Sequence, residues 1–135
     1  MASVQENLIS RRSIYRFQDK PVPRECLEQA FEAARHAPCH KQTHPWRFYV
    51  LGPAARAKLV DVAETLSREK SARSGEVDVE KMVIKARSKI GETPVLIAVT
   101  TARSAGDAFR EEEDYAATVC ALHNCLLYTS DAADE

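Results

Sequence analysis

Three arginines and a serine lie within six residues near the amino terminus, a spacing that suits phosphate binding. They stand in the stretch Arg11-Arg12-Ser13-Ile14-Tyr15-Arg16. Guanidinium groups bind phosphate oxygens through paired hydrogen bonds, and a neighbouring hydroxyl adds a further donor. A solvated basic turn has the same composition. The stretch is therefore either a phosphate clamp or a plain surface turn.

A second stretch gathers possible zinc ligands in nine residues, namely His36, Cys39, His40 and His44. Zinc favours Cys and His, but two of these residues are adjacent and no second group of ligands follows them. A zinc-stabilised interaction domain is therefore one alternative, and hydrogen bonding within the loop is the other. A Cys39 nucleophile beside His40 is disfavoured, because adjacent side chains rarely face each other and no acid is placed to orient the histidine.

Composition excludes several classes of function. The chain has 19 basic and 20 acidic residues, so bulk attraction to nucleic acid or to anionic lipid is not expected. Its four glycines do not form a dinucleotide fingerprint, and no phosphate loop is present. No apolar run is long enough for a membrane span, and the first residues lack a signal-peptide pattern. The four cysteines form no Cys-x-x-Cys pair, so we expect reduced thiols and a cytoplasmic protein.

The 135 residues fit one domain in which helices outnumber strands. Apolar periodicity predicts a helix after Pro23 that ends at Pro38, and aromatic or β-branched runs predict strands at 46–51 and 95–101. The second run is continuous, which is typical of a strand buried on both faces. We expect residues 67–78 to be a charged surface connection. Further helices are expected at 4–9, around 59–66, at 79–90 and at 115–126, the last with acidic residues 111–114 at its start.

Two motifs together are more specific than either alone. The first is the arginine stretch continued by Phe17 and by Pro21-Val22-Pro23. The second is Ala37-Pro38-Cys39-His40-Lys41 followed by Pro45-Trp46-Arg47-Phe48-Tyr49-Val50. Over about residues 7–127 the chain resembles the nitroreductase family of FMN-dependent oxidoreductases. The His-Lys pair is similar to that of a small bacterial branch of this family.

This resemblance implies an α+β fold, with a mixed sheet flanked by helices, of which the chain holds the amino-terminal portion. It also implies a homodimer with FMN in each of two interface clefts. Arg11, Arg12 and Ser13 would contact the phosphate, ribityl chain or ring edge, and His36, His40 and Lys41 would approach the flavin from the partner subunit. NAD(P)H would reduce the flavin, which would then reduce a small-molecule acceptor such as a nitroaromatic or a quinone, with ping-pong kinetics. No residue is assigned as a catalytic acid.

Two alternatives accompany this interpretation. One is a non-catalytic flavin- or nucleotide-binding module that uses the arginine cluster as its phosphate site, and the other is the zinc domain described above. The end of the chain also departs from the family, which continues with a Gly-rich turn and another strand. The string from Cys125 onward is similar to the translation of a transposase-end sequencing adapter. We therefore predict an incomplete nitroreductase-like domain over 1–127 and a non-native tail over 125–135.

Overall fold

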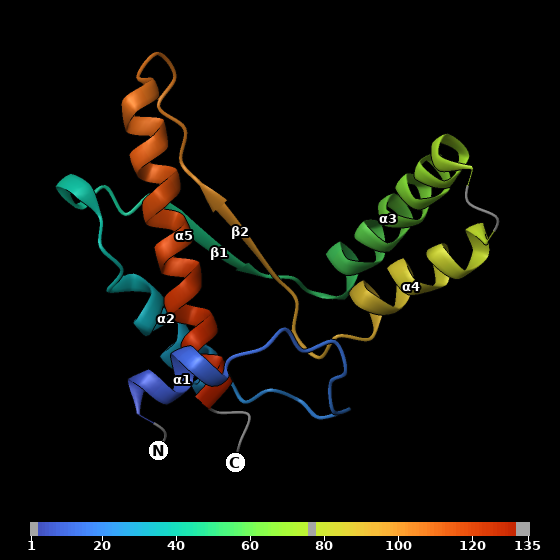
Figure 1. Cartoon of the computed structure of the whole chain (residues 1–135), viewed down its shortest axis with the longest axis horizontal. Helices are drawn as coiled ribbons and strands as arrows, with labels where there is room; N and C mark the ends of the chain where they lie inside the picture. Colours follow the sequence, from blue (N-terminus) through green and yellow to red (C-terminus); the bar gives the residue numbers. More distant parts are fainter. Residues whose placement is uncertain (1–2, 76–77, 132–135) are drawn as a thin grey trace. The chain divides into compact units, whose positions relative to one another are not determined.

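The computed structural model describes residues 3–75 and 78–131, with only the backbone described for 129–131. The last four positions of the predicted tail thus lie outside the described residues. The chain is α+β, as predicted, and clusters into two compact units, 1–16, 22–49 and 99–135 in the first and 17–21 and 50–98 in the second. The elements are α1 (Val4–Ser10), α2 (Arg24–Arg35), the 3-10 turn η1 (His40–Gln42), β1 (Trp46–Val50), α3 (Pro53–Ser74), α4 (Val79–Gly91), β2 (Ile97–Thr101) and α5 (Ala108–Asp131) (Figure 1).

The strands β1 and β2 form a two-stranded antiparallel sheet within the described residues. At one end the Ala102 N–H donates to the Pro45 carbonyl at 2.8 Å, and at the other the Leu51 N–H donates to the Leu96 carbonyl at 2.9 Å. Both strands were predicted, but β2 is half-buried along most of its length rather than enclosed on both faces. The reason is that the described residues offer β2 a single partner strand.

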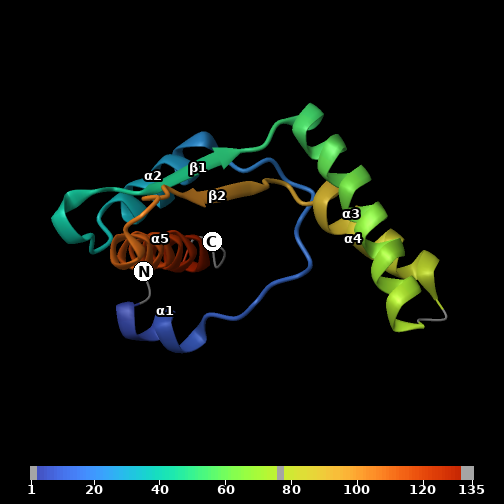
Figure 2. The ribbon, with the colours of Figure 1, turned by 90° about the horizontal axis from the view of Figure 1, so that it is seen from above.

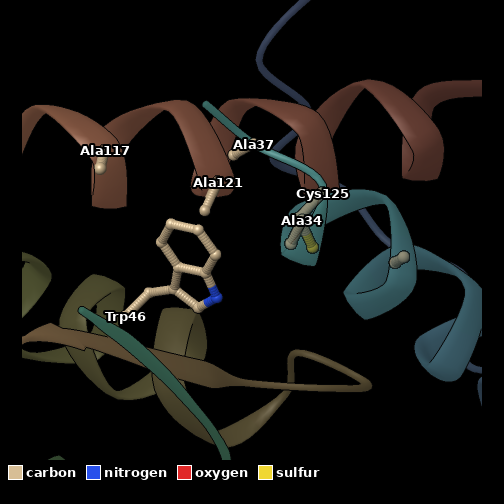
Figure 3. Packing of buried hydrophobic residues seen from close by; sticks show 7 residues of the cluster. Ala34, Ala37, Trp46, Ala117, Ala121 and Cys125 are labelled. Atoms are coloured by element: carbon tan, nitrogen blue, oxygen red, sulfur yellow. The ribbon is translucent and has the colours of Figure 1, made fainter. Parts of the chain in front are cut away.

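The core of the first unit lies where α2 packs on α5, and it consists mainly of small side chains. The buried residues are Ala30, Ala34, Ala37, Trp46, Ala117, Ala121 and Cys125. Figure 3 shows the Trp46 indole directed from β1 toward Ala121 on α5. Alanines at a helix contact allow the two helices to approach closely, and the one large indole fills the space beside them.

The helix α5 has two different apolar faces. Seen from above, it lies between α1 and the layer formed by α2 and the strands (Figure 2). In the sequence, Tyr115, Thr118, Val119, Leu122 and Leu126 form one helical stripe. The structure buries Thr118, but the four larger side chains of the stripe remain between 44% and 63% exposed. The neighbouring face, with its alanines and Cys125, is the one that packs against α2.

The second unit contains a helical hairpin of α3 and α4. The sequence predicts a surface connection over residues 67–78, but residues 67–74 are the last turns of α3. Residues 76–77 of the predicted connection lie outside the described residues. The residues of this segment are mostly helix-compatible, and Gly75 ends the helix in the left-handed conformation at φ 68°. The Arg56 guanidinium ties the start of α3 to the end of α4, because it donates to the carbonyls of Ile90 at 2.7 Å, Gly91 at 3.1 Å and Thr93.

Candidate functional site

The arginine cluster follows directly on a short capped helix. At the start of α1 the Glu6 N–H donates to the Ser3 hydroxyl, and the Ser3 N–H donates to the Glu6 carboxylate at 2.6 Å. These bonds hold the pKa of Glu6 below its ordinary value. At the other end Arg11 caps the helix, and its N–H donates to the Asn7 carbonyl. The basic stretch thus begins at a defined point on the surface of the first unit.

The side chains of this cluster fit an anionic ligand. Arg11 is half-buried, whereas Arg12, Ser13 and Arg16 are exposed. Through Nη1, Arg12 donates to the carbonyls of Ile9 and Arg11, each at 2.8 Å. A guanidinium carries five N–H donors, so this use of one nitrogen leaves donors for a phosphate. The donor chemistry therefore suits the phosphate of a flavin nucleotide.

The second predicted group of residues lies on a loop with an unusual backbone. Lys41, Gln42 and His44 have φ values of 52°, 52° and 44°. Non-glycine residues seldom adopt this left-handed region, which costs roughly 1 to 3 kcal/mol each, and such residues cluster at functional sites. The intervening Thr43 has ordinary helical angles. Contacts elsewhere must therefore stabilise this segment.

Those contacts join the loop to the first turns of α5. His40 Nδ1 lies 2.6 Å from Glu113 Oε2, and the Thr43 hydroxyl donates to Asp114 Oδ1 at 2.6 Å. Within the loop, the His44 N–H donates to Cys39 Sγ at 3.1 Å. The loop is thus held by side chains more than 70 residues away in the sequence.

The same contacts bear on two earlier alternatives, the zinc site and the Cys39 nucleophile. The four possible zinc ligands do not converge. His36 pairs with Glu32 at 3.0 Å, His40 with Glu113, and the His44 ring stands edge-on to Trp46, whose centroid is 5.4 Å away. The residues that the structure describes contain no group of three or more metal-binding side chains, so the zinc-domain alternative is wrong for this arrangement. His40 also faces Glu113 rather than Cys39, so it is not placed to activate the Cys39 thiol.

The predicted flavin-binding residues occupy two places in the first unit. His40 and Lys41 lie in η1, beside Glu113 and Asp114 near the start of α5, and His36 is exposed just after α2. The residues of the arginine cluster follow α1, which lines a pocket with Asn124, Leu127 and Tyr128 at the opposite end of α5 (Figure 1). Ten residues of helix separate Asp114 from Asn124, about 15 Å along the axis. One chain does not bring the two groups to a single point.

Sequence reasoning missed Thr43, Glu113 and Asp114 as parts of this site. It assigned the acidic run 111–114 to electrostatics at the start of a helix. Glu111 does lie in the first turn of α5, but Glu113 and Asp114 bind the loop instead. A threonine in a polar loop and two carboxylates in an acidic run carry no local signal of their pairing.

Comparison with known proteins identifies the family. The sequence profile of the nitroreductase family matches residues 8–133. The "Putative NAD(P)H nitroreductase YfhC" of Bacillus subtilis is 30% identical over 119 residues, which cover 87% of this chain and 59% of YfhC. A nitroreductase-like protein from Bacillus cereus aligns over 98% of this chain and 66% of its own with a TM-score of 0.74 and 28% identity. The chain belongs to the nitroreductase family.

A more distant structure has the same fold. Iodotyrosine deiodinase bound to FMN and 3-iodo-L-tyrosine aligns over 96% of this chain and 70% of its own, with a TM-score of 0.75 and 21% identity. The chain therefore has the nitroreductase-like fold, and it spans about 60% of the curated relative YfhC. Among the described residues, no helix combines the length and the apolar character that a membrane crossing requires.

Proposed function

We propose that this chain is part of an FMN-dependent oxidoreductase that uses NAD(P)H to reduce small-molecule acceptors such as nitroaromatics or quinones. FMN, when bound, would supply the redox chemistry between the nicotinamide and the acceptor, so the protein needs no catalytic triad. Family membership over residues 8–133 is the observation that carries the proposal. Donor and acceptor would occupy one site in turn, which gives ping-pong kinetics. The cytoplasmic location stays a prediction of the sequence.

The chain's own residues would bind and orient the cofactor. Arg11, Arg12 and Ser13 would hold the phosphate, ribityl chain or ring edge through charge-assisted hydrogen bonds. His40 and Lys41 would bring positive charge and N–H donors to a flavin from the other side, and His36 would stand nearby. Positive charge from these residues would favour an electron-rich flavin ring, and N–H donors would orient the bound cofactor.

The separation of the two groups supports a homodimer. If residues 11–13 of one subunit and the loop of the other meet at an interface, each of two symmetric clefts receives both groups. The exposed apolar side chains of Tyr115, Val119 and Leu122 on α5 offer a surface for such an interface. We propose that two chains pair through this face of α5 and share two flavin sites.

An anaerobic flavin titration tests the proposal. The product of the complete source gene is mixed with excess FMN, freed of unbound flavin by gel filtration, and titrated with NADH and NADPH while its absorbance near 450 nm is recorded. Retained yellow colour that bleaches with either nucleotide, and returns with a quinone or nitroaromatic, is the expected result. Colour that does not bleach would favour the non-catalytic flavin-binding module, and a colourless protein would contradict both.

A variant in the arginine cluster tests the phosphate assignment. Arg11→Ala removes one charge-assisted donor, which typically contributes about 1.5 to 3 kcal/mol, so FMN retention should weaken by about tenfold or more. Arg24→Ala is the matched control, because Arg24 is an exposed arginine of the same unit that pairs with Glu28 on its own helix. Equal FMN affinity in the Arg11 variant and in the wild type would count against this role.

The origin of the last residues of the chain is also a proposal. We propose that the nitroreductase-like domain is incomplete after residue 127 and that 125–135 derive from an adapter. Cys125 is buried in the core and α5 continues to Asp131, so residues 125–131 belong to this helix whatever their origin, and the family match extends to residue 133. Sequencing the source gene across codon 125 tests the proposal. An in-frame stop directly after codon 135 in the genomic sequence would refute it.

A further inference from the structure

We propose that Asp114 is a positioning residue that fixes the loop 39–44 through Thr43 and thereby places His40 and Lys41 for cofactor binding. The inference rests on the proposed flavin function for its last step. Asp114 lies in the second turn of α5, and its carboxylate contacts Thr43 of the loop and Arg110 of its own helix. It would act only through the conformation of the loop.

Burial makes the bond between these two residues a strong constraint. Asp114 is 4% exposed, and its Oδ1 accepts the Thr43 hydroxyl at 2.6 Å. Its other oxygen has Arg110 Nε at 3.6 Å, which is a weaker contact. A buried carboxylate that loses a hydrogen-bond donor is costly, so Asp114 resists any movement of Thr43 away from it.

Asp114 is itself held in place from the sheet side. The Thr118 hydroxyl donates to the Asp114 carbonyl at 2.9 Å and lies 3.0 Å from the Thr101 hydroxyl at the end of β2. The Thr101 hydroxyl lies 3.3 Å from the same carbonyl. Contacts with β2 and α5 therefore fix the backbone of Asp114 independently of the loop.

The loop needs such a constraint because its backbone is strained on both sides of Thr43. Lys41, Gln42 and His44 all have positive φ, whereas Thr43 does not. Strained residues persist only where the surroundings hold them. The hydroxyl of Thr43 lies at the centre of the strained segment, so the bond to Asp114 acts where a relaxing loop would move. A second contact, between His40 and Glu113, holds the beginning of the same segment.

The test removes the hydroxyl and follows the loop separately from the core. In Thr43→Val the side-chain volume is kept and the donor is lost. Residue-resolved amide hydrogen exchange should show the His44 amide exchanging about tenfold to a hundredfold faster, because the loss of a hydrogen bond to a charged group shifts a local opening equilibrium by that factor. The amide of Ala121, buried on α5 in the same unit, should keep its wild-type rate.

Three further single variants, one double variant and a second readout complete the test. Thr43→Ser keeps the donor and should restore slow exchange at His44. Thr65→Val, which removes an exposed hydroxyl from α3, should change nothing at the loop. Asp114→Ala should accelerate the His44 amide as Thr43→Val does, and the double variant should add little, because both remove the same bond. FMN affinity, measured by quenching of flavin fluorescence, should fall about tenfold in Thr43→Val and recover in Thr43→Ser.

Each contrary result is decisive. Unchanged exchange at His44 would show that the bond does not hold the loop. Equal acceleration at Ala121 would show a role in general stability only. A loop that opens with unchanged FMN affinity would show that it places nothing for the cofactor. A wild-type protein that takes up no FMN would overturn the proposed function and the cofactor step with it, whereas the His44 exchange rate would still decide whether Asp114 fixes the loop.

Discussion

A single enlarged alanine at the contact of α2 with α5 should destabilise the first unit. Ala121 has no exposed surface, and the Trp46 indole points toward it (Figure 3). Ala121→Val adds two methyl groups at a fully buried position in the contact between two helices, and overpacking of this kind typically costs about 1 to 3 kcal/mol. Valine also lowers helix propensity by up to about 0.7 kcal/mol. Together the two effects should lower the free energy of unfolding by roughly 1 to 4 kcal/mol, with a central value of about 2 kcal/mol.

The exposed neighbour Ala116 provides the matched control. Ala116→Val makes the same change on the same helix, so it carries the propensity cost without the overpacking. Urea unfolding followed by the fluorescence of Trp46, the chain's single tryptophan, reports on the core directly. With a slope of about 2 kcal/mol per molar urea, the midpoint should fall by about 1 M for Ala121→Val and by much less for Ala116→Val. Equal shifts in the two variants would refute the packing argument.

Three further predictions concern other groups. Arg56→Lys keeps the charge but replaces two donor nitrogens of a planar guanidinium, Nε and Nη2, with a single ammonium nitrogen that does not reproduce their geometry. Urea unfolding followed by circular dichroism should therefore show the hairpin of α3 and α4 weakened by about 1 to 3 kcal/mol, and an unchanged curve would contradict this. The hydrogen bond from His36 holds the pKa of Glu32 below its ordinary value. The contribution of this bond to folding stability is therefore present above the unfolded-state pKa of Glu32 and is lost as pH falls through its folded-state pKa. Carboxyl NMR should show a low midpoint that rises in His36→Ala, and an identical midpoint in both proteins would oppose the assignment. Burial raises the pKa of the Cys125 thiol. The folded state therefore keeps its full stability below the unfolded-state pKa of this thiol and loses stability as pH rises through its folded-state pKa. Cys125 should therefore react with a thiol reagent more slowly than the three half-buried cysteines, and equal rates would argue against that burial.

The order of elements was predictable because it depends on local patterns. Apolar spacing in residues 24–35 and the proline at 38 identify α2, and the run at 46–51 identifies β1, which the structure ends at Val50. The buried face of α5 was not predictable in the same way. Large apolar residues such as Tyr115 and Val119 dominate a hydrophobic pattern, but the core uses the alanines beside them. A pattern of residue types does not reveal that close helix packing requires small side chains.

In the candidate site, too, local features were predictable from the sequence and long-range contacts were not. The arginine cluster was recognisable from its residue types, since phosphate-binding chemistry is local to residues 11–16. The conformation of the loop was not, because Lys41, Gln42 and His44 adopt positive φ without being glycines. What stabilises them is a contact between Thr43 and Asp114, 71 residues apart, which only the folded chain brings together.

Flavin content is the most direct measure of the account's central claim. The source gene, sequenced past codon 125, is expressed, and its product is saturated with FMN and stripped of unbound flavin. The FMN released on denaturation is then compared with the protein concentration. We predict about one FMN per chain. A product that retains no flavin after exposure to excess FMN would contradict it.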